Sequence, residues 1–293
     1  MRGGSYTTFV NPVNLKELSW DKVIVLPSGR AKWEIARQLR SLGVPPEKIV
    51  LYFPEAARAW PSYEVRVTDA GFSARFGDVV FDALHTSDAI ILEDIFVSLE
   101  YALATPARSM MVVDIGMNVG LASLFFAAQA NVSAVYGFEP FAPTYEAALH
   151  NFRQNPAWIQ SKLHPQCLGL SNREATMRLP YSVDFPGGMS VYAPQREDGV
   201  EIHLADAAEV LAPLLAQEDH DKVLLKIDVE GSEYDILDSL SGAGLLEQVD
   251  YIVMETHCGK EALAKDVLAA HGFAFFSHQG ASGLGMIKAV RVA

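Results

Sequence analysis

The chain of 293 residues has the composition of an ordinary globular protein, with 50% hydrophobic, 10% aromatic and 20% charged residues. Its 36 Asp and Glu residues exceed its 23 Lys and Arg residues. The formal net charge of −13 argues against a protein that holds nucleic acid by neutralising phosphates. Two cysteines are too few for a disulfide framework, and no apolar run reaches the ~18 residues of a membrane span. The sequence therefore predicts a cytoplasmic protein with neither nucleic-acid nor membrane partners.

Residues 1–60 are predicted to form a small N-terminal β-α-β unit. Residues 23–26 and 49–53 are short apolar runs typical of strands, and the apolar residues between them follow the spacing of a helix. The turn at Ser28 and Gly29 precedes this helix and could hold a phosphate, but the full glycine fingerprint of a nucleotide site is missing. We therefore expect this turn to be structural.

Residues 61–108 are predicted to bridge the two ends of the chain with a hairpin and a helix. The helix is expected at residues 90–103 and carries Glu93 and Tyr101, which we expect to close over a ligand of the following region. The hairpin strands are expected at residues 63–67 and 79–81.

Residues 109–293 alternate continuous apolar strands with helices. This pattern predicts an α/β fold, in which helices cover both faces of a mostly parallel sheet. Two final strands without a helix between them predict an antiparallel strand at one edge, and a hairpin-like stretch is expected at residues 175–192. The strands are expected at residues 111–113, 134–138, 163–167, 200–204, 223–227, 251–254, 273–277 and 285–292.

The turn after the first of these strands reads Asp-Ile-Gly-Met-Asn-Val-Gly and begins at Asp114. Its glycines let the backbone approach a ligand, and Asp114 can accept a hydrogen bond from an ammonium group. Glu139, at the tip of the next strand, can accept both hydroxyls of an adenosine ribose. The alternatives are that the turn at Asp114 is a tight strand-to-helix turn without a ligand, and that Glu139 is an ordinary surface glutamate. Asp114 would repel a pyrophosphate, which favours S-adenosylmethionine over a nicotinamide dinucleotide.

Further acids follow two later strands. Asp228 and Glu230 lie two residues apart at a strand end, so both can point into one crevice. The next residues include Ser232, which can cap the following helix, and Glu233 in its first turn. His257 follows the next strand and could take a proton from a substrate hydroxyl.

Four motifs in this order resemble the FkbM family of S-adenosylmethionine-dependent methyltransferases. They read D-I-G-M-N-V-G, V-Y-G-F-E-P, L-G-L-S-N and L-L-K-I-D-V-E-G-S-E, and the similarity covers about residues 75–280. Met117 stands where the family usually has alanine. The resemblance implies a class I, Rossmann-like methyltransferase sheet of seven strands. It also implies O-methylation of a hydroxyl on a small metabolite such as a polyketide or sugar.

The resemblance also implies roles for individual residues. Glu139 would bind the ribose hydroxyls, Pro140 would shape the adenine slot, and Asp228 would face the methyl group. The methionine part would be held by Asp114, Gly116, Asn118 and Gly120. The adenine would be bordered by Leu170, Ser171 and Asn172.

The acceptor side has several candidate residues. We expect Asp228, Glu230 or His257 to act on the acceptor, because an unactivated alcohol must lose its proton during methyl transfer. Asp228, Glu255 and His257 could instead hold Mg²⁺. A loop at residues 186–190, surrounded by Tyr181, Phe185 and Tyr192, either covers the acceptor or is a plain hairpin turn.

The distribution of charge agrees with a cationic cofactor. Residues 197–255 hold 16 acidic residues against Lys222 and Lys226, and S-adenosylmethionine is net positive. The expected protein is thus a methyltransferase of a small-molecule acceptor, with a homodimer among the oligomeric states left open. The alternatives are a nicotinamide-dependent oxidoreductase and a non-catalytic member that binds the cofactor and acts through a partner.

Overall fold

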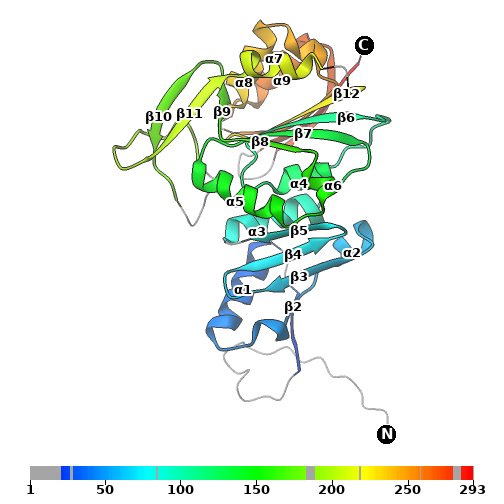
Figure 1. The fold of residues 1–293 in the computed structure, drawn as a ribbon, viewed down its shortest axis with the longest axis vertical. Helices are drawn as coiled ribbons and strands as arrows, with labels where there is room; N and C mark the ends of the chain where they lie inside the picture. Colours follow the sequence, from blue (N-terminus) through cyan, green and yellow to red (C-terminus); the bar gives the residue numbers. More distant parts are fainter. Residues whose placement is uncertain are drawn as a thin grey trace.

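The structure is a computed structural model that describes residues 21–26, 29–83, 85–182, 189–217, 219–257, 259–279 and 285–292. A layered α/β body forms one end of the elongated molecule, and a smaller part that contains the N-terminal elements forms the other (Figure 1). None of the helices in these residues is long and apolar enough to cross a membrane.

A seven-stranded sheet with the order β14-β15-β13-β12-β6-β7-β8 forms the centre of the body. Its strands are parallel except for β15, which runs antiparallel to both neighbours. The predicted fold class and the antiparallel strand near one edge are therefore confirmed. The strands are β6 (Met110–Ile115), β7 (Val132–Phe138), β8 (Leu163–Gln166), β12 (Lys222–Ile227), β13 (Tyr251–Thr256), β14 (Phe273–Gln279) and β15 (Gly285–Arg291).

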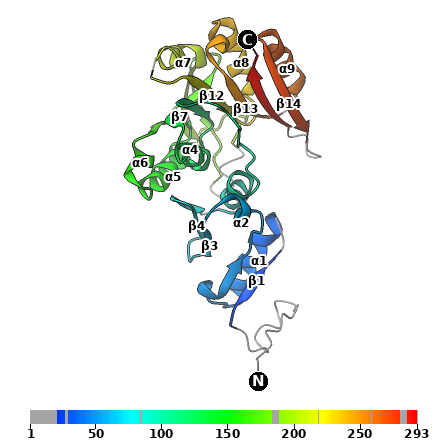
Figure 2. The same ribbon diagram turned by 90° about the vertical axis from the view of Figure 1, so that its right-hand side faces the viewer.

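Helices cover both faces of this sheet, as Figures 1 and 2 show. Alternate residues of β6 pack on opposite faces, because Val112 joins the core cluster of α4 whereas Met111 and Val113 join that of α7, α8 and α9. One face holds α4 (Leu121–Ala127), α5 (Ala142–Arg153) and α6 (Ala157–Gln160). The other holds α7 (Ala207–Leu215), α8 (Glu233–Gly242), η5 (Leu245–Gln248) and α9 (Glu261–Ala270).

The N-terminal elements form the predicted β-α-β unit. Strands β1 and β2 are parallel, and α1 lies between them in the chain. The amide of Gly29 donates to Oε1 of Glu93 at 3.0 Å, so this N–H group of the turn is hydrogen-bonded by a side chain of the protein itself. Ser28 of the same turn lies outside the described residues. The elements are β1 (Val23–Val25), α1 (Arg30–Ser41), η2 (Pro46–Lys48), β2 (Ile49–Leu51) and α2 (Ala56–Ala59).

The bridging region has one strand more than predicted. A three-stranded antiparallel sheet replaces the expected hairpin, and its central strand, β4, alternates buried and more exposed residues as a half-buried strand should. Phe96 of this region packs with Trp60 and Phe76 and also with Phe125 of α4, which joins the region to the body. The strands are β3 (Tyr63–Val67), β4 (Phe72–Phe76) and β5 (Val79–Ala83).

The predicted helix at residues 90–103 is shorter than expected. It begins as α3 (Thr86–Leu92) and widens into a π turn, η3 (Glu93–Val97), in which the amide of Ser98 donates to the carbonyl of Glu93 at 2.8 Å. Leu99 then has a positive φ of 56°, which no helix continues. Tyr101 therefore lies beyond the helix rather than on it.

A second small sheet corrects the expected hairpin at residues 175–192. Strand β10 (Ala175–Leu179) pairs antiparallel with β11 (Val200–Asp206), which also pairs in parallel with β9 (Gly169–Ser171). The returning strand of the hairpin is thus β11, and residues 183–188 between the two lie outside the described residues.

Candidate active site

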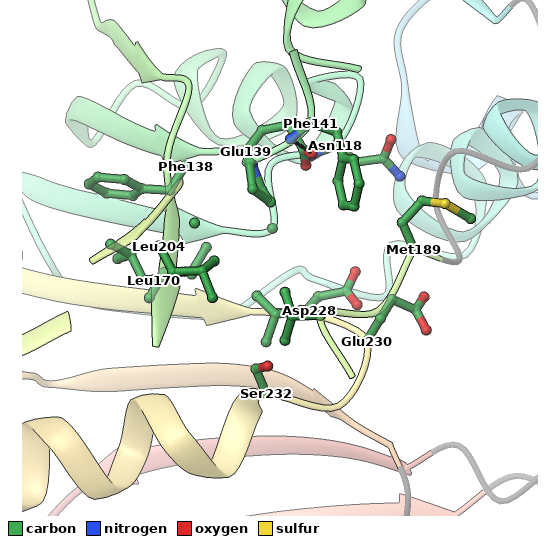
Figure 3. A pocket seen from close by; sticks show the side chains of 16 residues that line it. Asn118, Phe138, Glu139, Phe141, Leu170, Met189, Leu204, Asp228, Glu230 and Ser232 are labelled. Atoms are coloured by element: carbon green, nitrogen blue, oxygen red, sulfur yellow. Dashed lines mark hydrogen bonds between the residues drawn. The ribbon is translucent and has the colours of Figure 1, made fainter. Parts of the chain in front are cut away.

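Two adjoining cavities open at the carboxyl ends of β6, β7 and β12, the edge where ligands bind in open parallel sheets. Gly116, Asn118, Asp228 and Glu230 line both. The first, called the cleft, encloses about 600 Å³, part of it open to solvent (Figure 3), and its other lining residues include Phe138, Glu139, Pro140, Phe141, Leu170 and Ser232. The second, called the chamber, has a volume of about 790 Å³, part of it open to solvent, and its other lining residues include Ser87, Ile90, Ile91, Asp94, Tyr101 and Glu255.

The turn after β6 brings the backbone to the junction of the two cavities. Gly116 has a φ of 82°, and a Cβ added there would lie 1.7 Å from the carbonyl oxygen of Asp228. Gly120 has a φ of 83° and is packed against Phe152, but it lines neither cavity. Asn118, with a φ of 52°, lines both. The turn thus needs glycine at these positions because the backbone packs closely there. Of the residues predicted to hold the methionine part, a ligand in the cavities can reach Gly116 and Asn118.

Glu139 follows β7 and is buried in the wall of the cleft. Its Oε2 accepts from the amide of Asn118 at 3.1 Å, and its Oε1 accepts from the amide of Phe141 at 2.9 Å. Burial raises the pKa of Glu139 to about 7, and these two hydrogen bonds oppose part of the rise. Each carboxylate oxygen has a second lone pair, so Glu139 can also accept hydrogen bonds from a ligand.

An apolar slot forms the end of the cleft beyond Glu139. Pro140, Leu170 and Leu204 line it, and Figure 3 shows the two leucines side by side. Ser171 is buried and Asn172 is exposed, and neither lines the cleft. Of the residues predicted to border the adenine, Pro140 and Leu170 are therefore the ones that line the cleft.

Ser232 contributes a polar atom that lacks a partner. The residue is 1% exposed, lines the cleft, and has no hydrogen bond to its Oγ from any described residue. It occupies the N-cap of α8 as predicted, but its side chain makes no capping bond. A buried hydroxyl without a partner is costly, so this atom suits a ligand that supplies the missing hydrogen bond.

Asp114 lies behind the cavities rather than in their walls. It is 0% exposed, accepts from the hydroxyl of Ser123 at 2.6 Å, and pairs with the Nζ of Lys226 at 3.0 Å. Lys226 also donates to the carbonyl of Gly116 at 2.6 Å and lies 3.6 Å from Asp228. Burial alone would lower the pKa of Lys226, but the two aspartates outweigh it and raise the pKa. Asp114 therefore anchors this lysine, and the structure gives it no direct access to a ligand.

Asp228 lies beside Glu255, and the hydroxyl of Tyr101 connects the two carboxylates. The hydroxyl of Tyr101 donates to Oε1 of Glu255 at 2.7 Å and lies 3.2 Å from Oδ2 of Asp228. Burial and the charge of Asp228 raise the pKa of Glu255 to about 8, and the hydrogen bond from Tyr101 opposes part of this rise. Tyr101 comes from the irregular segment after η3, more than a hundred residues earlier in the chain, which no local pattern links to Asp228.

His257 is placed as a charged group between two glutamates. Its Nδ1 lies 2.7 Å from Glu233, and its Nε2 lies 3.5 Å from Glu230. Burial would lower the pKa of His257, but the hydrogen bond to Glu233 and the charge of Glu230 raise it to about 9. Both contacts favour the imidazolium, which cannot take a proton, and this argues against the predicted role of His257 as a general base near neutral pH. The pKa of Glu230 itself is raised to about 7, mainly by burial.

Glu93, expected to close over a ligand, points away from both cavities, and its neighbour Asp94 lies there instead. The carboxylate of Glu93 accepts from the amide of Gly29 in the N-terminal unit, and Glu93 lines neither cavity. Asp94 instead lines the chamber, and burial raises its pKa to about 7. The π turn of η3 redirects successive side chains, which a regular helical pattern does not predict.

The described part of the acceptor loop borders the cleft. Met189 lines the cleft, and Ser190 donates to the carbonyl of Glu230 at 2.6 Å. Tyr192 donates to Asp235 on the outside of α8. Tyr181 instead bonds to Thr144 away from the cleft, and Phe185 lies outside the described residues.

The three residues predicted to hold Mg²⁺ come together but already have other partners. Ligand atoms of Asp228, Glu255 and His257 lie within 4.8 Å of one another. The ammonium of Lys226 lies beside Asp228, Tyr101 donates to Glu255, and Nδ1 of His257 lies 2.7 Å from Glu233. Mg²⁺ prefers oxygen ligands in an open octahedral shell, so a divalent cation fits this set poorly.

We accordingly expect no binding of Mg²⁺ at this site. Titration of the protein with magnesium chloride in a calorimeter should give no heat beyond dilution up to about millimolar concentration. A saturable heat that disappears in Glu255→Gln but persists in Glu247→Gln, a variant of an exposed glutamate, would show that these residues do bind the metal.

Comparison with known proteins identifies the family. The family described as "Methyltransferase FkbM domain" matches residues 114–280, more than half of the chain. "Methyltransferase 1" of Beauveria bassiana is 28% identical over 208 residues, which cover 63% of this chain and 80% of that protein. "Methyltransferase sdnD" of Sordaria araneosa is 28% identical over 193 residues, or 57% of this chain and 73% of that one.

Two longer proteins match over a smaller share of their length. "AMB antimetabolite synthetase AmbE" of Pseudomonas aeruginosa is 28% identical over 230 residues, which cover 62% of this chain and only 10% of that protein. The crystal structure of a methyltransferase FkbM from Methylobacillus flagellatus is 15% identical. It covers 64% of this chain and 45% of its own, with a TM-score of 0.44. On the match over residues 114–280, the chain belongs to the FkbM methyltransferase family.

Proposed function

We propose that this protein is an S-adenosylmethionine-dependent methyltransferase that acts on a hydroxyl of a small metabolite. The observation that supports this most is Glu139, a buried carboxylate with free lone pairs in a cleft that joins a second cavity at Asp228. Membership of a methyltransferase family favours this function over a nicotinamide-dependent oxidoreductase.

The cleft fits the adenosine half of the cofactor. Glu139 would accept the ribose hydroxyls, Pro140 and Leu170 would enclose the adenine, and Ser232 offers the unpartnered hydroxyl. The backbone at Gly116 and the side chain of Asn118 lie at the junction, where the methionine end would begin. The cofactor brings a methyl group on a positively charged sulfur, and the acids around the junction suit that charge.

Asp228 would remove the proton of the acceptor. It lines both cavities, so it can face the methyl group from the cleft and the hydroxyl from the chamber. With the cofactor bound as methyl donor, Asp228 would take the proton that the acceptor hydroxyl loses when it accepts the methyl group. Lys226 on one side and Tyr101 with Glu255 on the other hold the carboxylate in place.

The relatives give limited support for the acceptor class. The name of the Pseudomonas aeruginosa relative is that of an antimetabolite synthetase, which accords with a natural-product acceptor, but only 10% of that protein is matched. A non-catalytic member that binds the cofactor and acts through a partner is the other candidate. Cofactor binding without methyl transfer to any component of a metabolite extract would favour it.

Glu139→Gln is expected to weaken S-adenosylhomocysteine binding by about a hundredfold, because a charged acceptor of two ribose hydroxyls is lost. Since the pKa of Glu139 is about 7 and only its ionised form accepts both hydroxyls, wild-type affinity should rise as pH rises through that value. Between about pH 6 and pH 8, calorimetric titrations should show the affinity of the wild type for S-adenosylhomocysteine rising by about tenfold more than that of the variant. Glu146→Gln, an exposed change on α5, is the matched control.

No heat with the wild-type protein at either pH, or equal affinities for wild type and Glu139→Gln, would contradict the proposed function.

A further inference from the structure

The chamber begins at the point where the adenosine half of the cofactor would end. The two cavities share Gly116 and Asn118, and the sulfur would lie at this junction beside Asp228. With the adenosine in the cleft, the short carbon chain beyond the sulfur leads into the chamber. The ammonium and the carboxylate at the end of that chain therefore need partners among the residues that line the chamber.

The partner that the sequence predicts for the ammonium is already in use. Asp114 is fully buried behind the cavities and pairs with the Nζ of Lys226 at 3.0 Å. The same Nζ donates to the carbonyl of Gly116 at 2.6 Å, and this positive charge disfavours a second ammonium beside that oxygen. The ammonium of the cofactor must therefore find another acceptor in the chamber.

Three of the four carboxylates that line the chamber already have a donor or a cation of the protein beside them. These pairs are Asp228 with Lys226 at 3.6 Å, Glu255 with Tyr101 at 2.7 Å, and Glu230 with His257 at 3.5 Å. The fourth, Asp94, is half-buried, and its side chain forms no hydrogen bond or ion pair with any described residue. Asp94 is therefore the acid of the chamber that is left for a ligand.

The surroundings of Asp94 make the lack of a cation costly. Ile91 and Ile95 line the chamber together with it, and Ile95 is 2% exposed. Burial and the neighbouring charges of Glu100 and Glu93 raise the pKa of Asp94 to about 7. A carboxylate in apolar surroundings and near like charges gains stability from an incoming ammonium group.

We propose that Asp94 binds the α-ammonium group of the cofactor in place of Asp114. The inference rests on the proposed function, because it requires the adenosine in the cleft. Oδ1 of Asn118 accepts from the amide of Val119 at 2.8 Å, which leaves its Nδ2 to donate to the carboxylate of the same amino-acid end. Asp94 precedes residues 114–280, so the bridging region rather than the matched family domain would supply the contact to the ammonium.

Three ligands that share the adenosine and the thioether test this contact. S-adenosylhomocysteine has the complete amino-acid end, methylthioadenosine lacks it, and an analogue of S-adenosylhomocysteine carries a hydroxyl in place of the ammonium. Each is titrated calorimetrically into the full-length protein at about pH 7.5. For the wild type, we expect replacement of the ammonium to weaken binding by about tenfold to a hundredfold, the usual effect of losing a charge-assisted hydrogen bond.

Asp94→Asn should weaken the binding of S-adenosylhomocysteine by about tenfold or more, because the ammonium loses its counter-charge. The affinities for methylthioadenosine and for the hydroxyl analogue should stay within about threefold of the wild type, since neither carries the ammonium. An unchanged affinity for methylthioadenosine also shows that the variant is folded. Asp78→Asn, at an exposed turn between β4 and β5, is the matched control and should leave all these affinities unchanged.

The outcomes separate this inference from the proposed function. Wild-type affinity for S-adenosylhomocysteine in Asp94→Asn, or an equal loss for S-adenosylhomocysteine and methylthioadenosine, would overturn the contact. A hydroxyl analogue that the variant weakens as much as S-adenosylhomocysteine would also overturn it, because Asp94 would then not recognise the ammonium. In each of these cases the wild type still binds S-adenosylhomocysteine, and the proposed function stands. No heat with the wild type and any of the ligands would overturn the proposed function and this contact together.

Discussion

Asp228→Asn is expected to lower the rate of methyl transfer by about a hundredfold to ten-thousandfold, because the amide cannot take the acceptor proton. The substitution keeps the shape of the side chain, so affinity for S-adenosylhomocysteine should change far less than turnover. Turnover is measured as S-adenosylhomocysteine formed with an acceptor selected from small hydroxylated compounds.

The matched control is Asp238→Asn, which changes an exposed aspartate on the outside of α8 and should leave turnover unchanged. Tyr101→Phe should give a smaller loss than Asp228→Asn, since Tyr101 only orients the carboxylates through its hydroxyl. Wild-type turnover in Asp228→Asn would remove this residue from the role of base and leave Glu230 as the next candidate.

Lys226→Met is expected to lower the free energy of unfolding by about 3–5 kcal/mol, the cost of leaving a buried charge without its partner. Asp114 is fully buried and its carboxylate lies 3.0 Å from this ammonium, so the variant leaves that charge uncompensated. The turn at Gly116 also loses the hydrogen bond to its carbonyl. Urea unfolding followed by circular dichroism measures the loss.

A double variant distinguishes the ion pair from simple loss of packing. Lys226→Met combined with Asp114→Asn should be more stable than Lys226→Met alone, because the uncompensated charge is removed. Lys222→Met, at the half-exposed start of β12, is the control. A loss below about 1 kcal/mol in Lys226→Met, or a double variant no more stable than the single one, would contradict this account.

The sequence predicted the sheet and the cleft well for a physical reason. Continuous apolar strands and the glycine turn at Gly116 are local patterns, and the carboxyl ends of adjacent parallel strands must meet at one edge. Asp228, Glu230 and Glu139 therefore come together as expected. The missed strand β4 alternates polar and apolar residues over a short segment, which is a weaker signal.

The parts that sequence could not predict depend on irregular backbone and on long-range pairing. Tyr101 reaches Asp228 and Glu255 because the left-handed residue Leu99 follows η3 and turns the chain back to the sheet. The π turn likewise places Asp94, rather than the predicted Glu93, in the wall of the chamber. His257 follows the expected strand, but its charge state depends on two glutamates whose distance no spacing reveals.

The most direct test of the central claim is a crystal structure of the protein with S-adenosylhomocysteine. We expect ribose hydroxyls hydrogen-bonded to Glu139, the adenine between Pro140 and Leu170, and the sulfur at the junction beside Asp228. A ligand whose ribose does not contact Glu139, or whose sulfur lies away from Asp228, would contradict it.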